Sequence, residues 1–166
     1  MQSLALIIFP ILMAYAASSD LLTMKIANWL MAALIIAYFA LALIGGVSWT
    51  EIGMNAAAGG LVLIFSFAFF VFGWIGGGDA KLVAATALWL GFGVLLPYLV
   101  YAALLGGALT LLILALRRYP LPAQLARYKW LDRLHDAKSG VPYGIALAIA
   151  GLLVYSETTI FHRFLG

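Results

Sequence analysis

The chain has 166 residues, of which 66% are hydrophobic and only 9% are charged, and its formal net charge is +3. A soluble domain is nearer half apolar and a quarter charged, so this composition excludes a soluble enzyme. It also excludes a disordered chain, which needs more charge to remain solvated. In a bilayer, the length allows about six helical spans of roughly 20 residues each. The composition therefore predicts an all-α, polytopic membrane protein with a single domain over residues 1–166.

Six apolar runs follow one another along the chain. The first, residues 3–17, is expected to be an uncleaved helix, because a secretory signal needs a basic segment before its apolar run and only Met1 and Gln2 precede this one. The other runs are residues 28–44, 54–74, 82–96, 98–116 and 141–155, with a turn expected at Pro97. Each run is expected to be helical, because backbone exposed to lipid must satisfy its own hydrogen bonds.

The placement of basic residues predicts the orientation of these spans. With six spans, eight of the nine Lys and Arg residues lie on one side: Lys25, Lys81, Arg117, Arg118, Arg127, Lys129, Arg133 and Lys138. Only Arg163 lies on the other side. Basic residues mark cytoplasmic loops, so this asymmetry predicts that the first side is cytoplasmic and that both termini are external.

The longest polar stretch, residues 117–139, is the main cytoplasmic segment in this topology. Its apolar residues fall at helical spacing: Ala123, Ala126, Trp130, Leu134 and Ala137. We expect an amphipathic helix that lies in the membrane interface and is attracted to anionic lipid. A basic topology anchor is an equally compatible interpretation. Since basic residues have this use in a membrane protein, we expect no nucleic-acid partner.

Cysteine is absent, and the chain has two histidines, His135 and His162. Disulfides, cysteine zinc sites and thiol nucleophiles are therefore excluded, and the histidines are too few and too widely separated for a metal site. We expect neither metal nor cofactor. The chain has six carboxylates, and the absence of cysteine and of clustered histidine is compatible with carboxylate chemistry.

Four carboxylates have ordinary explanations, because they lie among bases or at the external ends of helices: Asp132, Asp136, Glu51 and Glu157. Asp20 and Asp79 differ, because each stands at the cytoplasmic end of an apolar run. An ionisable group at membrane depth is costly and is a candidate functional residue. The alternative is that each aspartate only caps a helix.

The predicted topology places Asp20 and Asp79 at the same depth, where the helix bundle can bring them together. Two adjacent carboxylates cannot both ionise cheaply and therefore share a proton. One can then act as general base on a water while the other donates a proton to a scissile carbonyl oxygen. The preceding glycines, Gly76, Gly77 and Gly78, are expected to unwind a helix end and admit an extended substrate. A flexible loop or close helix packing would explain them equally.

These residues carry a resemblance to a known family. Residues 76–81 read Gly-Gly-Gly-Asp-Ala-Lys, which matches the G-x-G-D-x-K signature of GxGD-type membrane aspartyl proteases. Asp20, followed by Lys-Ile-Ala-Asn at residues 25–28, is similar to the second motif, an aspartate before a basic residue and Ile-Pro-Asn. The combination resembles the type IV prepilin leader peptidases, and the resemblance extends to Val-Pro-Tyr-Gly at residues 141–144.

The resemblance implies a GxGD protease-like helix bundle in the bacterial inner membrane, with Asp20 and Asp79 as its catalytic pair and a prepilin or pseudopilin as substrate. The other matching positions would serve substrate access or accessory roles: Gly76, Gly77, Gly78, Lys81, Lys25 and Asn28. Ala27 stands where the family commonly has proline, which should relax the start of the second helix without removing a catalytic group.

The chain also lacks the cysteine-bearing cytoplasmic domain of bifunctional family members, which N-methylate their products. The resemblance therefore implies a peptidase without methyltransferase activity, similar to the compact enzymes of tight-adherence (Flp) pilus systems, with archaeal preflagellin peptidases as a subsidiary possibility. Two alternatives come from other classes. One is a small transporter or proton-coupled channel with a membrane aspartate as its protonatable site. The other is a structural membrane subunit.

Overall fold

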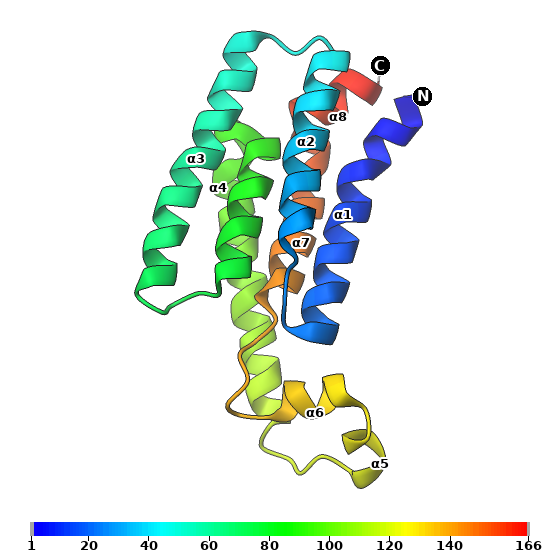
Figure 1. Cartoon of the computed structure of the whole chain (residues 1–166), viewed down its shortest axis with the longest axis vertical. Helices are drawn as coiled ribbons and strands as arrows, with labels where there is room; N and C mark the ends of the chain where they lie inside the picture. Colours follow the sequence, from blue (N-terminus) through cyan, green and yellow to red (C-terminus); the bar gives the residue numbers. More distant parts are fainter. Residues whose placement is uncertain (1, 166) are drawn as a thin grey trace.

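A computed structural model describes the backbone of residues 2–165 and the side chains of residues 5–122, 124–125 and 127–165. Over this part of the chain the fold is entirely helical, so the all-α prediction is confirmed (Figure 1). The elements are α1 (Gln2–Thr23), α2 (Asn28–Ile44), α3 (Trp49–Val71), α4 (Gly77–Leu116), α5 (Ala123–Ala126), α6 (Lys129–His135), α7 (Tyr143–Val154), the 3₁₀ turn η1 (Tyr155–Glu157) and α8 (Thr159–Leu165).

Helix α1 continues six residues beyond the apolar run that predicted it, from Ala17 to Thr23. Its polar end remains helical because hydroxyl groups bond to carbonyls one turn back: Ser18 Oγ donates to Ala14 O and Thr23 Oγ1 to Ser19 O, each at 2.7 Å. Asp20 therefore lies in the last turns of a helix and does not cap one.

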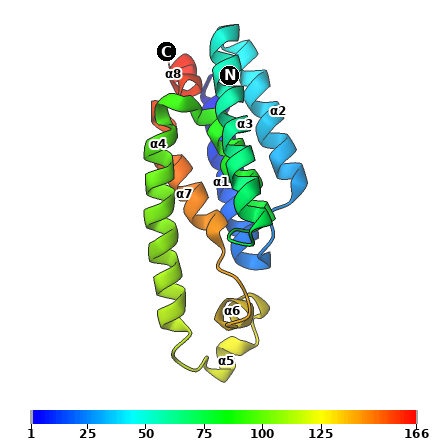
Figure 2. The ribbon, with the colours of Figure 1, turned by 90° about the vertical axis from the view of Figure 1, so that its left-hand side faces the viewer.

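The turn expected at Pro97 is wrong, because Pro97 lies inside α4 and the chain turns at Gly91. Gly91 has φ 64°, which favours glycine, and a Cβ there would collide with Asn55 Oδ1. Residues 77–90 and 92–116 are consequently two helical segments that double back on each other, as both views show (Figures 1 and 2).

In the part of the chain that the structure describes, three helices are long and apolar enough to cross a bilayer, within Ala5–Thr23, Trp49–Val71 and Gly77–Leu116. The bent pair Tyr143–Glu157 and Thr159–Leu165 adds a fourth if it is taken as one span. Helix α2 has the predicted bounds, but with 17 residues it is shorter than these spans. Length and composition thus give three to four spans, and the count of six remains a prediction that depends on how α2 and the two segments of α4 cross.

The centre of the bundle is an aromatic cluster of Phe9, Tyr38, Trp89 and Tyr155, all of which are buried. The ring of Phe9 lies 5.0 Å from that of Trp89 and 4.7 Å from that of Tyr155, and the rings of Tyr38 and Trp89 are 5.8 Å apart. Trp89 Nε1 donates a hydrogen bond of 3.0 Å to Leu34 O, so the buried indole is satisfied. This cluster joins α1, α2, α4 and η1.

The bundle has two distinct ends (Figures 1 and 2). The chain termini, the α2–α3 connection and the turn of α4 lie at one end. The end of α1, the starts of α2, α4 and α7, and the short helices α5 and α6 lie at the other. Three segments carry the basic residues that were predicted to be cytoplasmic: the α1–α2 connection, the start of α4 and residues 117–139. These segments are therefore grouped at one end of the molecule (Figure 1). The assignment of that end to the cytoplasm remains a prediction.

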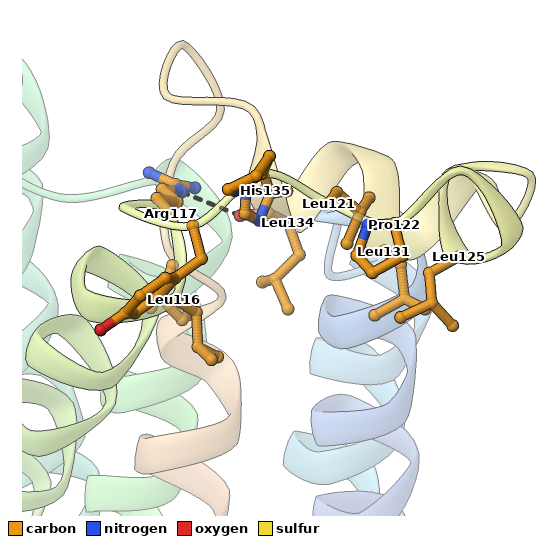
Figure 3. A pocket seen from close by; sticks show the side chains of 11 residues that line it. Leu116, Arg117, Leu121, Pro122, Leu125, Leu131, Leu134 and His135 are labelled. Atoms are coloured by element: carbon orange, nitrogen blue, oxygen red, sulfur yellow. Dashed lines mark hydrogen bonds between the residues drawn. The ribbon is translucent and has the colours of Figure 1, made fainter.

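Residues 117–139 do not form the continuous amphipathic helix that was expected. Tyr128 is extended (φ −87°, ψ 105°) and separates α5, with four residues, from α6, with seven. Apolar side chains of this segment line a cavity of about 280 Å³, and Arg117 at its edge donates to Leu134 O at 2.9 Å (Figure 3). The segment folds on itself because these backbone contacts compete with a single long helix. The side chains of Ala123 and Ala126 lie outside the described residues.

Candidate active site

Asp20 is held by a residue far away in the sequence. Its side chain is only 5% exposed, and Oδ2 accepts a hydrogen bond of 2.7 Å from Gly144 N in the first turn of α7. The first N–H groups of a helix have no partner within that helix, so a carboxylate from α1 satisfies one of them here. Asp20 therefore does not cap the helix that contains it, and its carboxylate instead bonds to an N–H in the first turn of α7.

Gly144 allows this contact because it has no side chain. A Cβ at this position would lie 2.8 Å from Asp20 Oδ2 and 2.9 Å from Ile26 Cδ1, which is closer than real side chains approach. From the sequence, Gly144 was only part of the family resemblance at residues 141–144, and its place at the site was not predicted. A glycine after Pro-Tyr at the beginning of an apolar helix was the available signal.

Asp79 lies in the first turn of α4, whose N-cap residue is Gly76. Its carboxylate turns back towards that residue, since a Cβ on Gly76 would lie 2.9 Å from Asp79 Oδ2. The side chain is half-buried. Ile26 lies beside Gly78, which precedes Asp79, and beside Gly144, which bonds to Asp20, so the two carboxyl groups lie at the same end of the bundle.

The three glycines before Asp79 behave differently from one another. Only Gly76 is extended (φ −70°, ψ 147°), whereas Gly77 and Gly78 are the first residues of α4, so the expected unwinding is limited to Gly76. Because Gly77 and Gly78 have no side chains, they instead leave room for two other side chains of the protein, Phe70 and Ile26. A Cβ on Gly77 would lie 3.1 Å from Phe70, and one on Gly78 would lie 3.2 Å from Ile26. Ile26 therefore packs between the start of α4 and the start of α7.

The residues after Asp20 connect the two motifs. Lys81 Nζ donates a hydrogen bond of 2.9 Å to Asn28 Oδ1, which joins the start of α4 to the start of α2. Lys25 has an exposed side chain and contributes its carbonyl, which accepts from Ser19 Oγ at 2.9 Å and from Thr23 Oγ1 at 3.2 Å. All the residues singled out in the sequence consequently lie at this end of the bundle.

The carboxyl groups of this site can carry out acid–base chemistry. Among the described residues, no three His, Cys, Asp or Glu side chains come together in a group that could hold a metal ion. The site combines two carboxylates at the same end of the bundle, one of them buried and bonded to a backbone N–H, with an adjoining apolar groove that Asp79 lines. A pair of this kind can exchange protons with a water and a substrate.

An apolar helix bundle with two carboxylates at one end defines a helical membrane protein with a candidate acid–base site. Comparison with protein families identifies it more closely, because a model of the type IV leader peptidase family matches residues 7–111. The chain therefore belongs to the type IV leader peptidase family, as the resemblance of its motifs predicted. The match includes both Asp20 and Asp79 but ends before α7 and Gly144. Searches of curated proteins and of solved structures found no match.

Proposed function

We propose that this leader peptidase is an aspartic endopeptidase, in which Asp20 and Asp79 cleave the basic leader from a type IV prepilin at the cytoplasmic face of the inner membrane. The observation that carries the proposal is that two carboxyl groups from separate helices, α1 and α4, lie at the same end of the bundle, where Ile26 packs beside both Gly78 and Gly144. An acid-poor chain that brings two of its six acids together is more simply explained by shared chemistry than by two independent caps.

In the proposed reaction, the ionised carboxylate removes a proton from a water as the water oxygen attacks the scissile carbonyl carbon. The protonated carboxyl group donates its proton to the carbonyl oxygen. When the tetrahedral intermediate collapses, the C–N bond breaks and the leaving amine takes up a proton. The bond from Gly144 N fixes one oxygen of Asp20, and Asp79 borders the neighbouring apolar groove.

The cytoplasmic location is supported by charge. The site lies at the same end of the bundle as α5 and α6, and most basic residues belong to this end. A prepilin presents a basic leader followed by an apolar helix, so its cleavage site should lie at the membrane surface. Both termini would then be external, and basic side chains of residues 117–139 would contact anionic lipid.

The compact, Flp-type form without methyltransferase activity is supported by the connection between α1 and α2. Only residues 24–27 join these helices, so there is no room at this point for the additional domain of bifunctional members. Mass spectrometry of the processed substrate tests this proposal, since the new N-terminus should be unmethylated even when a methyl donor is supplied.

Co-expression with a prepilin tests the catalytic pair. Asp20→Asn and Asp79→Asn should each reduce cleavage by a factor on the order of 10²–10⁴, because each removes one partner in proton transfer. Asp132→Asn is the matched control, since Asp132 is exposed in α6 and should be dispensable. Normal processing by either site variant would show that the pair is wrongly assigned. Ion flux that depends on one aspartate, with no cleavage, would favour the transporter alternative.

A further inference from the structure

Two grooves of similar size flank α3. The first, here named the Asp79 groove, has a volume of about 440 Å³ and reaches Asp79 and Tyr143. Its main apolar walls are Leu61, Phe65, Phe69, Leu95, Leu99 and Leu147. The second, the Lys81 groove, has a volume of about 410 Å³ and is bordered by α2, α3, α4 and Lys81. The two grooves are nearly equal in size and apolar character, but only the first includes a carboxyl group of the site.

We propose that the Asp79 groove holds the apolar helix of the substrate that follows the scissile bond. This inference rests on the proposed function, because it requires a peptide bond to be cleaved beside Asp79. Tyr143 belongs to the same groove and immediately precedes Gly144, whose N–H holds Asp20. One end of the groove therefore includes Asp79 and the residue next to Gly144, whereas the Lys81 groove includes neither.

The walls of the Asp79 groove suit a helix that lies parallel to the bundle. Leu61, Phe65 and Phe69 recur every four residues, so they form one stripe along α3, and they are 45%, 59% and 43% exposed. Leu95 and Leu99 repeat the same spacing on the second segment of α4. The α3 stripe is about 12 Å long, which matches roughly two turns of a helical ligand.

The direction of the groove also fits the substrate. The stripe on α3 starts near the middle of the helix and ends at Phe69. Phe69 is two residues before the last residue of α3, and this end of α3 lies on the side of the bundle that carries the catalytic pair. A substrate whose leader remains outside the bilayer would enter the membrane along this direction, with its scissile bond at the Asp79 end. The wall beside that end is braced by a hydrogen bond of 2.9 Å between Tyr143 Oη and Thr110 Oγ1.

Cysteine crosslinking tests the location directly, because the chain has no cysteine of its own. Leu61→Cys and Leu63→Cys form a matched pair, since both residues lie on α3 and are 45% and 44% exposed, but they face different grooves. Each variant is combined with Asp20→Asn to keep the substrate intact and is mixed, in lipid vesicles, with a prepilin carrying one cysteine in the first two turns of its apolar helix.

We expect the disulfide to form at least about tenfold faster with Leu61→Cys than with Leu63→Cys, corresponding to a preference of about 1.4 kcal/mol for the Asp79 groove. Equal rates, faster reaction at Leu63, or no crosslink at Leu61 from any of the substrate positions would overturn the proposal. The last result would leave lipid as the only occupant of the groove.

A kinetic comparison in the active enzyme separates this inference from the proposed function. Leu61→Trp should fill part of the Asp79 groove and raise KM for the prepilin by about tenfold, whereas Leu63→Trp should not change it. If the two aspartate variants are inactive but Leu61→Trp and Leu63→Trp have the same KM, the groove assignment fails and the catalytic pair remains. If the aspartate variants cleave normally, the proposed function is wrong, and the groove assignment that rests on it is wrong as well.

Discussion

The centre of the bundle and the end that carries the two aspartates are built in different ways. At the centre, Phe9, Tyr38, Trp89 and Tyr155 pack as buried rings from four elements. At the site end, single directional contacts join the elements, such as the bond from Gly144 N to Asp20 Oδ2. Packing spreads stability over many atoms, while a hydrogen bond depends on the position of two. Changes at the centre should therefore mainly affect stability, and changes to the contacts of the two aspartates should mainly affect activity.

The largest expected effect is at the centre. Trp89→Ala removes a fully buried indole and should lower the free energy of unfolding by about 3–5 kcal/mol, because the cavity it leaves cannot close completely. Thermal unfolding in detergent measures this change. Trp49→Ala is the control, since Trp49 is 77% exposed, and it should have little effect. Equal unfolding temperatures for the two variants would contradict the assignment of the aromatic cluster as the structural centre.

The second effect is at the site end. Gly144→Ala should reduce kcat for prepilin cleavage by about 100-fold, because the added methyl group displaces Asp20 from its bond. Gly151→Ala is a matched control on the same helix, where the new Cβ would lie 3.2 Å from Thr86 Cγ2 and 3.4 Å from Phe9 Cζ. It should lower the unfolding temperature while leaving the activity of folded enzyme nearly unchanged.

A second substitution identifies the cause of the Gly144 effect. Ile26→Val removes the Cδ1 atom that would lie 2.9 Å from the new methyl group. If displacement of Asp20 causes the loss, Gly144→Ala with Ile26→Val should remain about as slow as Gly144→Ala alone. Recovery of kcat in the double variant would instead attribute the loss to crowding against Ile26.

The smallest effect concerns the bond between Lys81 and Asn28. Lys81→Met and Asn28→Ala should each lower the free energy of unfolding by about 1 kcal/mol, because both remove the same exposed hydrogen bond. The double variant should be no less stable than either single variant, and Lys138→Met in the exposed loop is the control. Additive losses would show that the two residues act independently and do not connect α2 to α4.

Much of the fold was predictable because apolar runs are a direct signal of helices in a membrane protein. The bounds of α2 agree with the prediction at both ends, 28 and 44. The turn in α4 was not predictable from the same signal, because residues 82–116 are apolar on both sides of Gly91. Proline was the stronger local indication, but the chain turns at Gly91, which has a positive φ and lies so close to Asn55 of another helix that a Cβ would collide with it.

The short helices α5 and α6 were missed for a similar reason. The spacing of apolar residues in 117–139 is compatible with one helix, and nothing in that spacing reveals where Arg117 and Arg133 will bond. In the structure, Arg117 donates to three carbonyls, those of Leu134, Ser139 and Gly140, and Arg133 donates to Leu22 O at 3.1 Å. Contacts with distant backbone groups thus override a local helical pattern.

The sequence by itself determined the class of protein, the helical content and the family, because these depend on composition, local periodicity and short motifs. It also identified Asp20 and Asp79 as candidates, since acids are scarce in the chain. Only the tertiary structure decided what surrounds them. Asp20 bonds to a residue 124 positions away, and Asp79 lines a groove formed by three helices. Such contacts follow from how helices pack, so the spacing of residues along one helix does not reveal them.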